Sequence, residues 1–175
     1  MKRWEIVLAG SGGQGLIVGA ILLGTAAAKY GYHVAQTQSY GVAARGGSSE
    51  ADVVISDESI VYPKAVNPDI VLALTEGAFK KYYGRLKPGA VLLIDTDNVS
   101  WQGQEKNVYG LPFTSLARDL GNPGSINICG LGAILGIKEI VPMEVMEETI
   151  VNQFAEKYRE ANLAIFRKGM NLIRK

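Results

Sequence analysis

The stretch EIVLAGSGGQGLIVGA, residues 5–20, contains the features that decide the fold. Its first five residues form a short, mainly apolar run that ends in glycine, which predicts a strand buried in a parallel sheet. Residues 16–30 are apolar and helix-forming, and Gly31 follows them as a C-terminal cap. Between strand and helix, Gly10, Gly12 and Gly15 satisfy the pattern G-x-G-x-x-G. This order of strand, glycine turn and helix predicts a Rossmann-like α/β domain.

The predicted helix is apolar nearly all round, because Leu16 to Ala28 leaves it without a charged face. A helix of this kind is covered on both sides. We expect one side to pack on its own sheet and the other against a neighbouring chain. The composition supports a surface covered by another chain, since only 20% of the residues are charged, against about 25% in a typical soluble domain.

The rest of the chain continues the α/β pattern. Further strands are predicted at 33–38, 51–56, 59–62, 69–74 and 90–95, and helices at 76–86, from Thr114, at 125–137 and in a final pair from Pro142 to Arg174. Asp57-Glu58 joins two of the strands as a two-residue hairpin, and the loop at 39–49 is too short for a crossover helix. We therefore expect a single domain over residues 1–175, with a mostly parallel mixed sheet, an antiparallel hairpin and a helical C-terminal end.

Residue counts exclude several functional classes. The 18 basic and 17 acidic residues are interspersed, so the basic excess that binds nucleic acid is missing. One cysteine and one histidine leave no ligand set for zinc or an iron–sulfur cluster, and we expect no metal site. The longest apolar stretch is shorter than the about 20 residues that span a bilayer. The amino terminus lacks a signal-peptide pattern, so we expect a cytoplasmic protein without membrane contact.

Two interpretations of the glycine turn remain open from the residues. In a dinucleotide-binding fold the glycines let the backbone turn tightly, approach a pyrophosphate and pack helix on strand. That fold also needs an acid about 20 residues further on, and no Asp or Glu lies between Glu5 and Glu50, which disfavours NAD. NADP binding through Arg45 stays open, as does a turn that serves only close packing. Gln14 either forms hydrogen bonds with a partner's backbone or with a ligand amide, or it makes a hydrogen bond from the start of the helix to the second loop.

The second polar loop, residues 39–49, is expected at the same carboxyl edge of the sheet, where ligands of open α/β sheets bind. Arg45 presents a guanidinium suited to a carboxylate or phosphate, or else it pairs with an acid of its own domain or is solvated. We predict no catalytic residue in this chain. The residues expected to form ligand or subunit-contact loops are Gly10, Gly12, Gly13, Gln14, Gly15, Ser39, Tyr40, Gly41, Arg45, Gly46, Gly47 and Ser48.

Three other side chains are weaker candidates for chemistry. Asp95 and Asp97 follow a predicted buried strand, where they either face the crevice or serve as helix cap and turn residue. Cys129 lies in an apolar, glycine-rich helix with no histidine assigned to it, which indicates a small core residue rather than a nucleophile.

The motifs of the two loops carry a resemblance to a known family. They are Gly12-Gly13-Gln14-Gly15, Gln36-Thr37-Gln38-Ser39-Tyr40-Gly41 and Ala44-Arg45-Gly46-Gly47-Ser48, with further matches at 51–56, at 86–89 and at Asn127 before 130–133. Over nearly its whole length the chain resembles the gamma subunit of 2-oxoacid:ferredoxin oxidoreductases, also called the pyruvate/ketoisovalerate oxidoreductase gamma type. The Gln-Thr-Gln-Ser-Tyr-Gly form is most similar to the 2-oxoglutarate branch rather than the pyruvate branch. Val42-Ala43 stand where that branch commonly has Pro-Glu, a carboxylate that this chain lacks.

The resemblance implies an assembly that decarboxylates a 2-oxoacid on thiamine diphosphate and passes electrons through iron–sulfur clusters to ferredoxin. The assembly releases CO2 and an acyl-CoA, with CoA as co-substrate. Thiamine diphosphate, magnesium and the clusters are then expected on alpha and beta partner subunits and an optional ferredoxin-like delta subunit. This chain would be a non-catalytic structural subunit, its loops near the CoA and substrate access region. It lacks both the Gly-Asp-Gly motif of a magnesium–diphosphate site and a cluster-binding cysteine set.

Two alternatives belong to other classes. A free-standing NADP-dependent reductase would use Gly10, Gly12, Gly15 and Arg45. A small interaction protein would oligomerise through the helix at Leu16 to Ala28, and self-association of the isolated chain is left open.

Overall fold

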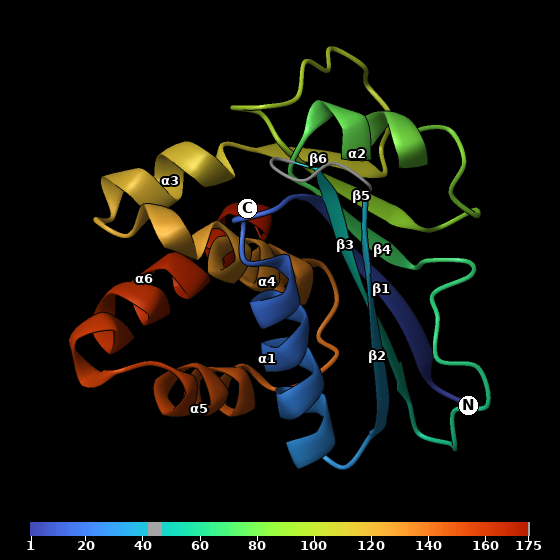
Figure 1. Cartoon of the computed structure of the whole chain (residues 1–175), viewed down its shortest axis with the longest axis horizontal. Helices are drawn as coiled ribbons and strands as arrows, with labels where there is room; N and C mark the ends of the chain where they lie inside the picture. Colours follow the sequence, from blue (N-terminus) through green and yellow to red (C-terminus); the bar gives the residue numbers. More distant parts are fainter. Residues whose placement is uncertain (42–46, 175) are drawn as a thin grey trace.

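The computed structural model describes residues 1–41 and 47–174, which form one sheet of six strands in the order β2-β3-β1-β4-β5-β6 (Figure 1). The strands are β1 (Arg3–Ser11), β2 (His33–Tyr40), β3 (Ser48–Ser56), β4 (Ile70–Ala73), β5 (Val91–Asp95) and β6 (Val108–Leu111). Neighbours from β1 to β6 are parallel, whereas β3 is antiparallel to both β1 and β2. The expectation of an α/β fold with a mixed, mostly parallel sheet is confirmed.

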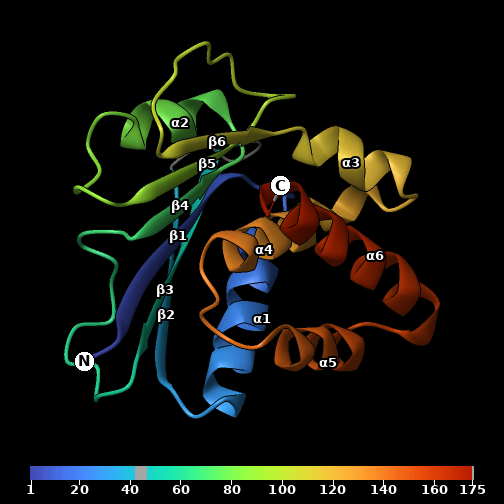
Figure 2. The ribbon, with the colours of Figure 1, turned by 180° about the vertical axis from the view of Figure 1, so that it is seen from behind.

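Helices cover both faces of this sheet (Figures 1 and 2). One face carries α1 (Leu16–Lys29) and α4 (Ile126–Ile137), with α5 (Met143–Gln153) and α6 (Glu156–Ile173) packed outside them, and α3 (Phe113–Asp119) leads from β6 toward α4. The other face carries α2 (Glu76–Tyr82). Within the described ranges, every helix is too short or too polar to cross a bilayer.

The central strand β1 separates two hydrophobic cores, because successive side chains of a strand point to opposite faces. Ile6 and Leu8 belong to the larger core beneath α1 and α4. Val7 and Ala9 belong to the smaller core beneath α2. All four are at most 2% exposed. Burial on both faces explains why this strand is a continuous apolar run instead of an alternating one.

Helices α4 and α6 pack backbone against backbone. A Cβ atom added to Gly132 of α4 would lie 2.0 Å from the carbonyl oxygen of Phe166 in α6. A Cβ atom on Gly169 of α6 would lie 2.1 Å from the carbonyl oxygen of Cys129 in α4. Gly132 and Gly169 therefore allow the two helices to approach closely, and the Cys129 side chain is buried there.

The hairpin predicted over residues 51–62 is wrong. Residues 59–62 form no strand, and Val61 is 96% exposed. The outer edge of β3 is already occupied by β2, which pairs with it from His33 to Tyr40, so a strand at 59–62 has no partner there. The loop between β2 and β3 is shorter than predicted, and β6 is a strand that the sequence did not predict.

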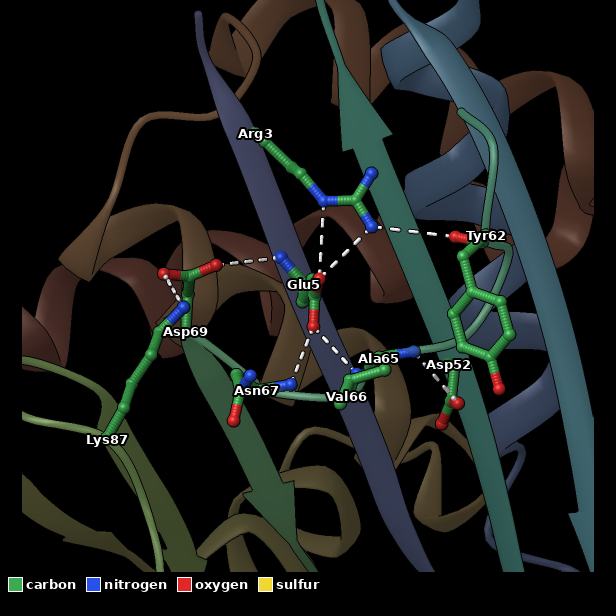
Figure 3. A network of polar contacts seen from close by, with 9 residues as sticks. All are labelled: Arg3, Glu5, Asp52, Tyr62, Ala65, Val66, Asn67, Asp69 and Lys87. Atoms are coloured by element: carbon green, nitrogen blue, oxygen red, sulfur yellow. Dashed lines mark hydrogen bonds and ion pairs between the residues drawn. The ribbon is translucent and has the colours of Figure 1, made fainter. Parts of the chain in front are cut away.

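Carboxylates hold the segment between β3 and β4 against the sheet (Figure 3). Glu5 Oε2 accepts hydrogen bonds from the backbone N–H groups of Val66 and Asn67, at 2.8 Å each. Asp52 Oδ2 accepts from the N–H of Ala65 at 3.3 Å. Burial raises the pKa of Asp52, against the opposing effect of the Ala65 hydrogen bond. Backbone groups that would otherwise form a strand ladder are thus satisfied by side chains.

Candidate functional site

A cavity of about 380 Å³ opens at the carboxyl ends of β1 and β4. β1 leads into α1 on one face of the sheet, whereas β4 leads into α2 on the other. Ligands of open α/β sheets bind where the connections diverge in this way. The cavity is lined by Ala9, Gly10, Ser11, Ser39, Tyr40, Gly41, Ser48, Ser49, Glu50, Thr75, Gly77, Ala78 and Lys81.

The side chain of Gln14 folds back over the first glycine of the turn. Its Oε1 accepts a hydrogen bond from the N–H of Ser11 at 2.8 Å, and its Nε2 donates to the carbonyl of Leu74 at 3.4 Å. The amide thus joins the carboxyl ends of β1 and β4. A Cβ atom on Gly10 would lie 2.2 Å from Gln14 Oε1, so only glycine leaves room for this side chain. One of the two interpretations of Gln14 was a hydrogen bond to the second loop; its Nε2 donates instead to the residue that follows β4.

The second loop is tied to the turn through the main chain. The N–H of Gly12 donates to the carbonyl of Gly47 at 3.2 Å, and the N–H of Gly41 donates to the carbonyl of Ser48 at 2.7 Å. The N–H groups of Ser11 and Gly12 are therefore engaged within the chain and do not face a pyrophosphate. This geometry gives no support to the alternative of an NADP-binding reductase.

Asn127, at the start of α4, fixes the start of α1. Its Nδ2 donates to the carbonyl of Gly15 at 2.9 Å, and its Oδ1 accepts from the N–H of Ile128 at 2.9 Å. The side chain is 3% exposed. The C-terminal helical layer thereby holds the glycine turn in place from behind, a link between residues 112 positions apart in the chain.

The structure brings five of the predicted loop residues to the cavity wall: Gly10, Ser39, Tyr40, Gly41 and Ser48. Tyr40 is 64% exposed, an aromatic ring presented to solvent at the rim. The lining does not include Gly12, Gly13, Gln14, Gly15 and Gly47. Arg45 and Gly46 lie outside the described residues.

The opposite wall of the cavity was not predicted from the sequence. Thr75 caps α2, its Oγ1 accepting from the N–H of Ala78 at 3.3 Å, and Lys81 Nζ pairs with Glu50 Oε2 at 2.7 Å. Burial, followed by the nearby Glu50 carboxylate, raises the pKa of Tyr82 beside this pair. The Thr-Glu pair after the buried run at 69–74 is a helix-start signal. This signal predicts where α2 begins, but it does not predict that β4 lies next to β1.

The other candidates have structural roles. Asp95 is fully buried, and it accepts hydrogen bonds from Thr114 and Asn98. Asp97 accepts from the N–H and hydroxyl of Ser115, in the first turn of α3. Both carboxylates therefore fit the cap and turn interpretation. Burial raises the pKa of the Cys129 thiol to about 12, which keeps it protonated and unreactive at neutral pH.

Comparison with known proteins places the whole chain in one group. Residues 5–172 match the family model described as pyruvate ferredoxin/flavodoxin oxidoreductase. The 2-oxoglutarate synthase subunit KorC of Methanocaldococcus jannaschii is 44% identical, over 95% of this chain and 92% of that protein. The pyruvate synthase subunit PorC of Methanothermobacter marburgensis is 30% identical, over 94% and 96%.

Longer relatives contain the same unit as a part. The ketoisovalerate oxidoreductase subunit VorA of Methanothermobacter thermautotrophicus is 30% identical over 94% of this chain but only 35% of its own length. Among solved structures, a keto/oxoacid ferredoxin oxidoreductase gamma subunit from Geobacter sulfurreducens has a TM-score of 0.82 at 34% identity, covering 96% of each chain. A 2-oxoglutarate:ferredoxin oxidoreductase from Magnetococcus marinus, with 2-oxoglutarate, coenzyme A and succinyl-CoA bound, has a TM-score of 0.85 at 23% identity, over 99% of this chain and 31% of that one.

Proposed function

The chain belongs to the pyruvate ferredoxin/flavodoxin oxidoreductase family, and on this premise we propose that it is the gamma subunit of an enzyme that oxidatively decarboxylates 2-oxoglutarate. The enzyme is a 2-oxoacid:ferredoxin oxidoreductase of the EC 1.2.7 class. The substrate rests on the identity to the 2-oxoglutarate synthase subunit, 44%, against 30% to the pyruvate synthase subunit. Each match extends over nearly the full length of this chain and of the relative, which supports an equivalent role for the whole chain.

The catalytic groups belong to partner subunits in this proposal. Among residues 1–41 and 47–174, no three His, Cys, Asp or Glu side chains gather as a metal site. The single cysteine of the chain is buried in α4, and Asp95 and Asp97 are engaged as caps. These residues do not fit thiamine diphosphate with magnesium or an iron–sulfur cluster. The chain therefore contributes structure and contacts, while the alpha and beta subunits, with an optional delta subunit, carry the chemistry.

The longer relatives support a stable partnership with another chain. The segment equivalent to this protein makes up about a third of the VorA subunit and of the Magnetococcus chain. In those proteins the unit is covalently continuous with further polypeptide. We expect the separate chain to dock on the polypeptide that corresponds to that remainder.

The cavity at the carboxyl ends of β1 and β4 is the proposed point at which this chain contacts the route of CoA to the catalytic subunits. Its wall combines backbone of the two loops with Thr75, Gly77 and Lys81 at α2, a mixed polar and apolar lining of the kind that small ligands use. Tyr40 at the rim is accessible to a ligand or to a partner chain. The similarity to the Magnetococcus structure supports the fold of this chain. The proposed contact with CoA rests on the cavity and its lining.

Co-expression tests the subunit role. The catalytic subunits are purified with and without this chain, and 2-oxoglutarate- and CoA-dependent reduction of ferredoxin is measured. We expect the complete complex to be active and the preparation without this chain to lose assembly or activity at least tenfold. Full assembly and turnover without the chain would contradict the proposal.

A cavity variant tests the site separately. Gly77 lines the cavity, and a Cβ atom on it meets no atom within 4 Å, so Gly77→Phe introduces a ring there from an unobstructed backbone position. We expect this variant to assemble and to raise the KM for CoA at least tenfold, with Gly77→Ala as the matched control close to wild type. An unchanged KM in an assembled Gly77→Phe complex would remove the cavity from the route of CoA but leave the subunit role intact.

A further inference from the structure

The strand β2 forms one end of the sheet, and no other strand among residues 1–41 and 47–174 pairs with its outer edge (Figure 1). It is eight residues long and pairs with β3 in continuous register, without a bulge. The opposite edge, β6, has only four residues. Among the described strands, β2 therefore offers the longest row of unpaired backbone N–H and C=O groups.

This edge lacks the features that normally keep a sheet edge from pairing. Proteins protect long edges with charged side chains, proline or bulges. β2 reads HVAQTQSY, and no Asp, Glu, Lys, Arg or Pro occurs between Lys29 and Arg45. Its side chains are nevertheless largely exposed, with Gln36, Gln38 and Tyr40 all solvent-accessible. An uncharged, regular and accessible edge of this length is a template for another strand.

The two faces of β2 follow from its neighbours. Val34 points toward α1, since a Cβ atom on Gly24 of that helix would lie 3.1 Å from its Cγ1. Gln36, Gln38 and Tyr40 share that face by the two-residue period of a strand. Thr37 points to the other face, where its hydroxyl donates to Asp52 Oδ2 at 3.4 Å.

We propose that β2 pairs antiparallel with β2 of a second copy of this chain, about a two-fold axis at Thr37. In this register Gln36 lies opposite Gln38 of the other copy, and Val34 lies opposite Tyr40. Each glutamine amide both donates and accepts, so the pair is self-complementary, and aromatic–β-branched cross-strand pairs are favourable. No like charges meet, because neither strand carries one. The two sheets join into one continuous sheet.

The neighbouring part of α1 favours the same interface. Val18 and Ile21 are 36% and 41% exposed on the helix that covers β2 and β3. A register centred on Gln36 would instead set Val34 against Gln38 and leave Tyr40 beyond the paired strand. The Thr37 centre buries more apolar surface, which selects it over that alternative.

Charge substitution at the edge tests the pairing. We expect the full-length chain to sediment as a dimer at tens of micromolar and Gln36→Lys/Gln38→Lys to sediment as a monomer with unchanged circular dichroism. Gln102→Lys/Gln104→Lys, with the same spacing at exposed positions, is the matched control and should remain dimeric. Mixing the lysine variant with Gln36→Glu/Gln38→Glu should restore a heterodimer. A monomeric wild type, or a dimer that survives the lysine pair and is lost with Ile21→Lys, would overturn the proposal.

Disulfide trapping tests the register. Opposed residues of an antiparallel pair have Cα atoms about 5 Å apart, within disulfide range. Thr37→Cys should therefore form a covalent dimer with oxidised glutathione, while Cys129 is buried and gives little background. Ser39→Cys is the control, because its two copies would lie about 13 Å apart along the strands. Trapping of Ser39→Cys in preference to Thr37→Cys would overturn the register.

Discussion

The side-chain amide of Asn127 donates to the carbonyl of Gly15, 2.9 Å away, and so connects the first turn of α4 to the first turn of α1. The same side chain accepts from the N–H of Ile128. Both helices cover one face of the sheet, but they are separated by most of the chain. This contact makes the position of the glycine turn depend on the C-terminal helical layer.

Asn127→Ala should lower the free energy of unfolding by about 1–2 kcal/mol, because it removes both hydrogen bonds of a buried side chain and takes this acceptor from the N–H of Ile128, while the Gly15 carbonyl keeps the N–H of Gly19. Urea denaturation of the full-length chain measures the loss. Asn171→Ala, on the exposed side of α6, is the control and should stay within about 0.5 kcal/mol of wild type. A loss at Asn127 as small as that of the control would show that the link carries no stability.

Gly10→Ala and Gln14→Ala should be strongly coupled. The new methyl group on residue 10 would overlap Gln14 Oε1 and displace the side chain, so each single change removes the same hydrogen bonds at a cost of about 1–2 kcal/mol. The double variant should be no less stable than either single one, which gives a coupling energy of about 1 kcal/mol or more. Additive losses in urea titrations would mean that Gln14 does not hold the turn.

The helices and most strands were predictable because their signals are local. The apolar run before Gly10, the cap at Gly31 and the buried runs at 69–74 and 90–95 each give an element within a few residues of its observed bounds. Strand pairing was less predictable. Val61 and Tyr62 have high strand propensity, yet β2 already pairs with the edge of β3 that they would need. Which strand pairs with β3 depends on residues far apart in the chain, and the local sequence pattern does not predict it.

The candidate site was predicted in part for the same reason. Residues 10 and 39–41 follow strands, so their place at the carboxyl edge was readable from the chain. Thr75 and Lys81 reach the cavity only because β4 lies next to β1 and sends its helix to the opposite face. That adjacency is a property of the whole sheet.

Asp52→Asn should stabilise the protein at neutral pH. Burial raises the pKa of Asp52 in the folded state above its usual value of 3.8, so its ionisation costs folding free energy as pH rises through the folded-state pKa. Asparagine keeps an acceptor for the N–H of Ala65 without the charge. The stability difference between variant and wild type should therefore be present at pH 7, shrink as the pH falls through the raised folded-state pKa of Asp52, and vanish below about 4, near the unfolded-state value. A variant less stable than wild type at pH 7 would contradict the sign of this effect.

Gly132→Ala should be among the most destabilising single changes in the chain. The added methyl group meets the backbone oxygen of Phe166 at 2.0 Å and the backbone nitrogen of Met170 at 3.0 Å, and backbone does not yield as a flexible side chain does. The helices α4 and α6 must move apart, at a cost of about 3 kcal/mol or more. This outweighs the gain of about 1 kcal/mol that alanine brings to a helix interior. Gly77→Ala in α2 separates the two effects, because its methyl group meets nothing and should leave stability unchanged or slightly higher. Thermal unfolding compares the pair, and equal midpoints would mean that the two helices are not in backbone contact.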